Sequence, residues 1–233
     1  MQRQYVVVDF EMNPVSRANR EAREKMNREI IEIGAVRLDE SLTVVDRFGC
    51  FVSPQYNKEI TSYITDLTGI SRFETYNAPS FADALRQFED WIGYDRETVL
   101  YSWSESDREQ LEAECAFKQL PLPGNMREWV DFQAEYMEAM GYADGSRQMA
   151  LHTAAEQFGI GMDLKSSHSA QYDADVTAEL VISVLSGEYR RQAELLQSAS
   201  LGDPEDSGCS IGDCFGGIFQ ELLQSDEQGS QDE

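Results

Sequence analysis

The segment YVVVDFE, residues 5–11, decides the fold, because it predicts a buried β-strand that ends in two acids. Its run of β-branched residues is typical of a central strand covered on both faces. Side chains alternate along a strand, so Asp9 and Glu11 project to one side and Phe10 enters the opposite layer. Two neighbouring carboxylates at the end of a core strand favour a divalent-cation site. Two solvent-facing acids on an edge strand are the weaker alternative.

The remaining pattern predicts strands that alternate with helices. Apolar runs predict strands at residues 4–10, 30–38, 42–53 and 97–103. Apolar positions at helical spacing predict helices at residues 80–93, 107–119, 147–158 and 173–185. WVDFQAEYMEAMG predicts a short strand that runs into a helix, and the polar segment 13–29 is either a flap or a short exposed helix. This order predicts an α/β fold with a mixed sheet flanked by helices.

Three further residues extend the chemistry of the acidic pair. Asp107 lies in SWSESDREQL, and His168 and Asp173 stand five apart in HSAQYDAD. Asp173 lies at the start of the last predicted helix, where the helix dipole favours an acid, so a plain helix cap is an alternative role. Asp107 could likewise be a plain helix cap, and Glu105 is the nearest other acid that could take its catalytic place. A histidine beside a cation site can take a proton from water at neutral pH, which favours metal-assisted phosphodiester hydrolysis.

The net charge of −24 argues against strong binding to long nucleic acids, because such binding relies on Lys and Arg that neutralise phosphates. Nine acids and no basic residue lie between Asp203 and Glu233, but the rest of the chain is also acidic. We therefore expect weak, salt-sensitive and metal-dependent binding to short or single-stranded ends.

The four cysteines are scattered and include no CxxC pair. We therefore expect no disulfide framework and no structural zinc site. The default expectation for the location is the cytoplasm. No apolar run approaches the roughly 20 residues that a membrane span needs, so no membrane association is expected.

The last segment, residues 198–233, predicts a disordered acidic tail. Within it, residues 214–224 are apolar enough to form a short helix that docks in the groove of a protein partner. A helix that folds back onto its own domain is an equal alternative, and Gly216 and Gly217 weaken any helix there.

Five motifs occur in one order along the chain: DFE, IIEIGAV, ITDLTGIS, SWSESD and HSAQYDA. Together they resemble the successive motifs of the DEDDh 3′–5′ exonucleases, and within these the ERI-1-like and sporulation-inhibitor (KapD-like) group. The resemblance runs from about Tyr5 to about Leu185. It implies an RNase H-like fold and an exonuclease domain over residues 1–197.

The resemblance also implies roles for the site residues. Asp9, Glu11 and Asp173 would hold the first of two Mg²⁺ or Mn²⁺ ions, Asp9 would also contact the second, and Asp107 would contribute through water. His168 would be the general base. The family spacing places the ligand five residues after this histidine, which excludes Asp175.

Substrate contacts are implied at Phe10, Met12, Thr68, Gly69 and Ile70. Gly69 would allow close backbone approach to the terminal nucleotide, and Ile70 could wedge against a base. For the segment from Thr68 to Ile70, a loop and helix start in the core is the competing interpretation.

The insertion between the first two strands concentrates basic residues, namely Arg17, Arg20, Arg23, Lys25 and Arg28. It directly follows Asp9 and Glu11, so one hypothesis is that it guides the phosphate backbone. A solvated, self-paired loop is equally compatible with the sequence.

We therefore expect a metal-dependent 3′–5′ exonuclease that releases nucleoside 5′-monophosphates from RNA or short single-stranded DNA. The alternative is an interaction module or proofreading-type subunit, recruited through the C-terminal tail.

Overall fold

The computed structural model describes residues 2–142, 148–161, 168–190 and 193–194. Met1–Tyr189 form one compact unit, and a second unit begins at Arg190. The predicted domain end at residue 197, the acidic tail and the apolar helix at 214–224 lie outside the described residues.

A five-stranded mixed sheet forms the centre of the first unit. It consists of β1 (Arg3–Pro14), β2 (Arg28–Leu38), β3 (Val44–Phe51), β4 (Glu97–Ser102) and β5 (Trp129–Asp131). The strand order is β3-β2-β1-β4-β5. The central strand β1 pairs antiparallel with β2 and parallel with β4. The predicted mixed sheet with the YVVVDFE strand at its centre is therefore confirmed.

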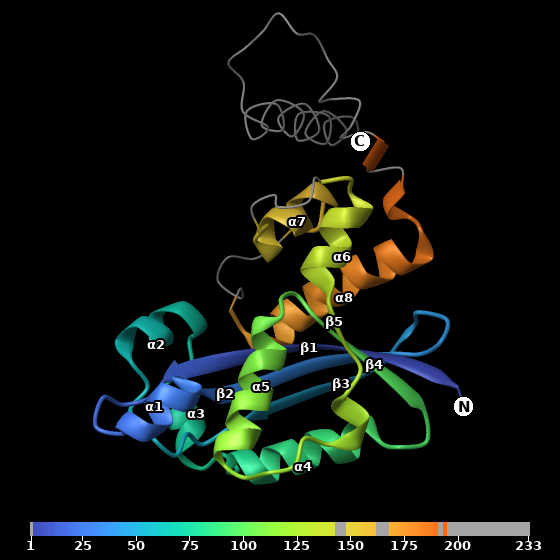
Figure 1. Ribbon diagram of the computed structural model, residues 1–233. Helices are drawn as coiled ribbons and strands as arrows, with labels where there is room; N and C mark the ends of the chain where they lie inside the picture. Colours follow the sequence, from blue (N-terminus) through green and yellow to red (C-terminus); the bar gives the residue numbers. More distant parts are fainter. Residues whose placement is uncertain (1, 143–147, 162–167, 191–192, 195–233) are drawn as a thin grey trace, which may run out of the picture. The chain divides into compact units, whose positions relative to one another are not determined.

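The helices cover both faces of this sheet. They are α1 (Arg20–Met26), α2 (Ser62–Thr68), α3 (Arg72–Tyr76), α4 (Phe81–Ile92), α5 (Ser106–Phe117), the 3₁₀ turn η1 (Gly124–Met126), α6 (Phe132–Ala139), α7 (Leu151–Gln157) and α8 (Ala170–Ser186). Figure 1 shows α8 across one face of the sheet and α4 and α5 on the other. Phe10 packs into the core on the α4 and α5 side, as the alternation along β1 predicts. Among the described helices, none combines the length and apolar character that a membrane crossing requires.

Most predicted elements are present, with ends shifted by a few residues. Segment 13–29 proves to contain a short helix, α1, whose Ala22 and Met26 are buried. The last helix begins at Ala170, so Asp173 lies in its first turn. Two short helices, α2 and α3, were not predicted, although both carry capping signals. Thr61 accepts the N–H of Ile64, and Ser71 forms a capping box with Glu74.

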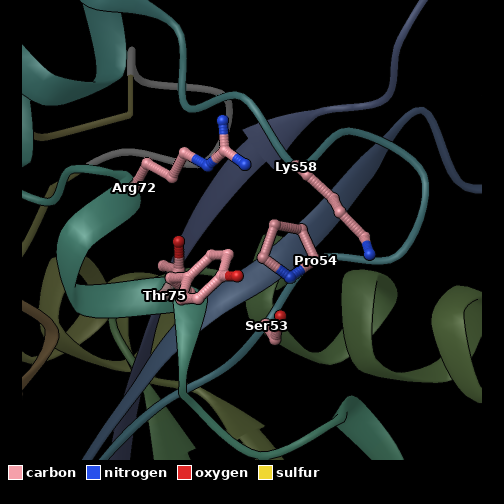
Figure 2. A pocket seen from close by; sticks show the side chains of 6 residues that line it. Ser53, Pro54, Lys58, Arg72 and Thr75 are labelled. Atoms are coloured by element: carbon pink, nitrogen blue, oxygen red, sulfur yellow. The ribbon is translucent and has the colours of Figure 1, made fainter.

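Helix α3 borders a small surface pocket of about 60 Å³ (Figure 2). It is lined by Ser53, Pro54, Lys58, Arg72, Thr75 and Tyr76. In Figure 2, Lys58 and Arg72 lie on opposite sides of this pocket.

The first turn of α8 lies directly on β2 at Gly34. A Cβ atom on Gly34 would fall 2.2 Å from the carbonyl carbon of Ala170, which is far inside van der Waals contact. Only a residue without a side chain lets α8 approach the sheet this closely, and this contact fixes where His168 and Asp173 stand.

Gly34→Ala is therefore expected to destabilise the protein by about 1–3 kcal/mol, because α8 must move to admit the methyl group. The measurement is urea denaturation followed by tryptophan fluorescence. Gly49 pairs with Gly34 across β2 and β3, and its Cβ would meet only the Gln171 side chain at 3.7 Å, so Gly49→Ala is the matched control. Equal stability of the two variants would contradict the close-approach explanation.

Candidate active site

The centre of the site is the acidic end of β1. Asp9 and Glu11 are both partly buried, whereas Phe10 between them is buried in the opposite layer. A β-bulge follows Glu11 in the pairing with β2. The two acids therefore leave the sheet toward the α8 face, as the sequence predicts.

Asp107 reaches the same strand from α5. Strand β4 pairs with β1 only as far as Val7, and beyond this point an Asp107 side-chain oxygen accepts the N–H of Phe10 at 3.1 Å. Asp107 is 5% exposed, whereas its rival Glu105 is exposed at the N-cap of α5. The geometry therefore brings Asp107 rather than Glu105 to the acids of β1.

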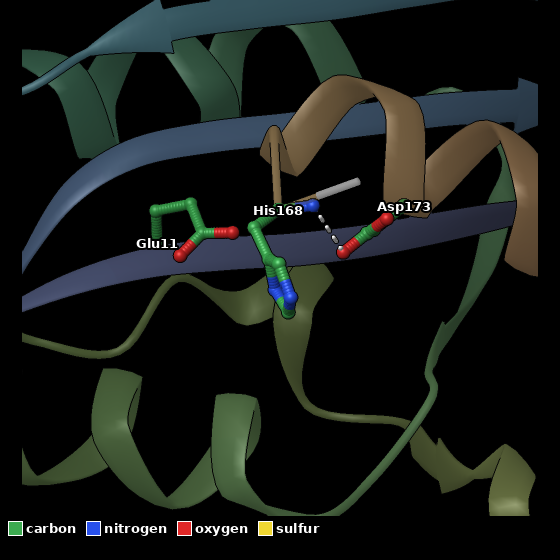
Figure 3. A group of neighbouring side chains, drawn as sticks. All are labelled: Glu11, His168 and Asp173. Carbon is green, nitrogen blue, oxygen red and sulfur yellow. Dashed lines mark hydrogen bonds between the residues drawn. The ribbon is translucent and has the colours of Figure 1, made fainter. Parts of the chain in front are cut away.

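His168 and Asp173 complete the group from α8 and the residues before it. One side-chain ligand atom each of Glu11, His168 and Asp173 lie within 4.8 Å of one another (Figure 3). The backbone N–H of His168 also donates to an Asp173 carboxylate oxygen at 3.2 Å. His168 has a left-handed backbone conformation, with φ of 69°, which is uncommon for a non-glycine residue.

Burial raises the pKa values of these acids, and repulsion between carboxylates adds to this for Asp9 and Glu11. The pKa of Asp9 lies well above its ordinary value because of burial, followed by repulsion from Asp107 and Glu11. Burial and the charge of Asp173 raise the pKa of Glu11 to about 8. Burial also raises the pKa of Asp107 to about 7, against the lowering effect of the Phe10 N–H and the Arg28 charge. A bound cation would offset this repulsion.

The residues fit a hard divalent cation. The donors that meet here are mostly carboxylate oxygens, which Mg²⁺, Mn²⁺ and Ca²⁺ prefer. Among the described residues, one carboxylate oxygen of Asp173 is buried without any hydrogen-bond partner. A buried oxygen of this kind is costly unless it has a ligand, so it supports a cation held by Asp9, Glu11 and Asp173.

The sequence analysis missed one acid, Glu32, which stands directly opposite Glu11 on β2. It is buried, and its carboxylate accepts the N–H of Ala170 at 3.0 Å. Burial raises its pKa, and the Ala170 N–H lowers it. The signal was its presence as the one acid in the apolar run IIEIGAV. Glu32 holds the first turn of α8, and with it His168, against β2.

Two other residues that could be taken for site residues, Asp175 and His152, have different surroundings. Asp175 forms an ion pair with Arg47 at 2.7 Å. His152 is exposed on α7.

The predicted substrate-binding residues differ in exposure. The side chains of Phe10, Met12 and Ile70 are buried, and Ile70 packs with Ile31 and Ile64. The Thr68 hydroxyl donates to the carbonyl of Ile64. Gly69 ends α2 with φ of 74° and has open space around it. Contact of these residues with a substrate stays a prediction.

The chain resembles known proteins in sequence and in fold. The family model described as "Exonuclease" (RNase_T) matches residues 6–181. The DNA polymerase III PolC-type of Caldanaerobacter subterraneus is 29% identical over 184 residues, which are 78% of this chain and 12% of that protein. The 3′-5′ exoribonuclease 1 of Rattus norvegicus is 25% identical over 166 residues, which are 67% of this chain and 47% of that protein. The chain thus spans less than half of either relative.

Among solved structures, the nuclease domain of 3′hExo, a DEDDh family member bound to rAMP, matches with a TM-score of 0.68 and 22% identity. The match covers 79% of this chain and 92% of that one. It confirms the predicted RNase H-like fold.

The raised pKa of Glu11 predicts a dependence of stability on pH. In the folded protein its pKa is about 8 instead of 4.5, so ionisation is disfavoured by folding and stability is lost as pH rises between these values. Without divalent cations, Glu11→Gln should therefore raise the melting temperature at about pH 9 and much less at about pH 5. Glu105→Gln, which changes an exposed acid, is the control. A lower melting temperature of Glu11→Gln at the higher pH would refute this.

Proposed function

The chain belongs to the RNase_T exonuclease family, and on that premise we propose that it is a metal-dependent 3′–5′ exonuclease that releases nucleoside 5′-monophosphates. The observation that carries the proposal is the meeting of Glu11, His168 and Asp173 from opposite ends of the domain within 4.8 Å. The neighbouring Asp9 and Asp107 complete the set that the DEDDh pattern requires.

The ions, when bound, supply positive charge to the attacking and leaving oxygens of an in-line displacement at phosphorus. Asp9, Glu11 and Asp173 would hold these ions, and Asp107 would support the site from the N-terminus of α5. His168 takes a proton from the attacking water. The new bond joins the water oxygen to phosphorus, and the bond to the 3′ oxygen of the preceding nucleotide breaks. That oxygen takes a proton from solvent water, and the terminal nucleotide leaves with its 5′ phosphate. His168 then returns its proton to solvent.

We assign RNA or short single-stranded DNA as the substrate and Mg²⁺ or Mn²⁺ as the ion. The oxygen-rich donor set suits both ions, and the relative named 3′-5′ exoribonuclease 1 supports RNA. The cytoplasm is the proposed compartment, in keeping with the free thiols of Cys50 and Cys115.

The basic residues of α1 and its flanks support contact with the phosphate backbone. Within the part of the chain that the structure describes, Lys25 pairs with Glu21, whereas Arg17, Arg20 and Arg23 form no ion pair. Helix α1 packs against α5, which carries Asp107. These three arginines are therefore available to bind phosphates, whereas Lys25 fits the self-paired alternative.

The first test is a timed digestion of 5′-labelled single-stranded RNA and DNA with Mg²⁺, Mn²⁺ or EDTA. We expect a ladder that shortens from the 3′ end, absent in EDTA and in Asp173→Asn, because that change removes one ligand charge without changing side-chain size. Degradation at the wild-type rate by Asp173→Asn would exclude the proposed mechanism.

His168→Ala is expected to lower kcat by about 10²–10⁴-fold, because the attacking water loses its general base. The decrease in kcat of His168→Ala should be smaller at higher pH, because hydroxide is more abundant there and needs no general base. His152→Ala, on an exposed helix position, is the control and should keep the wild-type rate. An unchanged kcat in His168→Ala would assign the proton transfer to another group.

Replacing Arg17, Arg20 and Arg23 together by Ala should weaken binding of single-stranded substrate at low salt and flatten its salt dependence. Each phosphate contact contributes about −0.7 to the slope of log affinity against log salt for single strands. The control replaces Arg3, Arg86 and Arg96 by Ala, which removes the same charge elsewhere. Equal slopes in the two triple variants would rule out a specific phosphate path along α1.

A further inference from the structure

Helix α3 exposes two large aromatic rings that do nothing for the fold. Phe73 is 87% exposed and Tyr76 is 68% exposed, and the only buried residue of α3 is Thr75. The two rings are three residues apart, so they emerge on the same side of the helix. Apolar surface left in water gains nothing on folding, and neighbouring exposed rings indicate a binding surface.

Two cations border these rings. The Arg72 guanidinium lies 5.7 Å from the centre of the Tyr76 ring, and Lys58 lines the pocket that Arg72 and Tyr76 share (Figure 2). On its other side, Tyr76 shares an open hollow with Phe73 and Arg72. The α3 surface, defined as Lys58, Arg72, Phe73 and Tyr76, thus combines flat apolar faces with positive charge.

The nearby acids leave this charge available. Arg72 pairs with Glu59 at 2.6 Å, but both side chains are more than half exposed, so a phosphate can replace this weak pair. Glu74 already accepts hydrogen bonds from the backbone N–H and the hydroxyl of Ser71. Asp66 on α2 is the remaining exposed acid of the segment.

The α3 surface is tied to the strand that carries the catalytic acids. Asn13 lies two residues after Glu11, and its side-chain amide donates to the carbonyls of Asn57 and Glu59. The Asn13 side-chain oxygen accepts the N–H of Thr61. The loop that carries Lys58, and the Glu59 partner of Arg72, are thereby fixed to the end of β1.

We propose that the α3 surface binds the single-stranded part of the substrate upstream of its 3′ end, with bases stacked on Phe73 and Tyr76. This rests on the proposed exonuclease function and adds a second contact region to it. Stacking suits this acidic protein, because every base offers a π-face whatever the net charge of the protein. Lys58 and Arg72 then need only to neutralise the phosphates of the stacked nucleotides. In a nucleic-acid duplex the π-faces of the bases are covered by neighbouring base pairs, so the α3 surface selects single-stranded substrates.

The test measures binding with catalysis switched off. Fluorescence anisotropy with a labelled single strand of about 12 nucleotides would compare Asp173→Asn with the same protein carrying Phe73→Ala and Tyr76→Ala. Loss of the rings should weaken binding about 10-fold or more, with an unchanged salt slope, since bases rather than phosphates lose their contact. The control is Tyr94→Ala, which removes a 60% exposed ring after α4. Equal melting temperatures of the variants would show that all are folded.

A second labelled oligonucleotide tests how much the upstream bases contribute to binding. It carries normal bases only at its two 3′-terminal positions and abasic sites upstream. The protein with intact rings should bind it about 10-fold or more weakly than the normal strand, whereas the Phe73→Ala and Tyr76→Ala protein should bind both strands equally. If the Phe73→Ala and Tyr76→Ala changes weaken binding of both strands by the same factor, stacking of bases on these rings is refuted. Unchanged binding of the normal strand would also overturn it and leave the surface to a protein partner. Neither result depends on hydrolysis, so a failed digestion would refute the exonuclease and not this contact.

Discussion

The burial of carboxylates close to one another is the constraint on which the candidate site depends. Asp9, Glu11, Asp107 and Asp173 all have raised pKa values, and burial is the first cause for each. Flexible acids would avoid this cost by moving apart into solvent. The fold prevents this, because Asp9 and Glu11 are attached to β1, Asp107 to α5 and Asp173 to α8. Asp107 and Asp173 also accept backbone hydrogen bonds. A bound cation would offset the cost of keeping these carboxylates buried and close together.

The topology explains how the scaffold does this. Strand β1 continues beyond the end of β4, and Asp107 occupies the position beside Phe10 where β4 no longer pairs. On the opposite edge β1 remains paired with β2. From there Glu32 holds the first turn of α8, which the missing side chain of Gly34 allows to approach. Asp107 is therefore placed where β4 stops pairing, and Asp173 is placed by the close approach of α8 at Gly34. Neither placement depends on a long loop.

The sequence predicted what depends on long patterns. The apolar run before Asp9, the helical spacing of α4 and the motif order were sufficient for the sheet and its main helices. Of the five predicted site residues, the structure brings Glu11, His168 and Asp173 together, and the roles of all five stay predictions. Helices α2 and α3 have only seven and five residues, so apolar positions hardly recur along them. Glu32 was missed for a different reason. A lone acid in the apolar run IIEIGAV is a weak signal, because an exposed strand residue gives the same pattern, and only the Ala170 N–H beside it shows its role.

The acidity of the chain makes the distribution of its binding groups informative. A uniformly basic surface would hold any polyanion, whereas a net charge of −24 repels nucleic acid almost everywhere. Among the described residues, the groups proposed to attract a strand are Arg17, Arg20 and Arg23, the cation site and the α3 surface. They would use different forces, chiefly phosphate neutralisation, ion coordination and stacking. A strand would gain from all three only if it is single-stranded and places its 3′ end among the acids. Specificity for an end would then follow from repulsion elsewhere on the surface, without any need to recognise sequence.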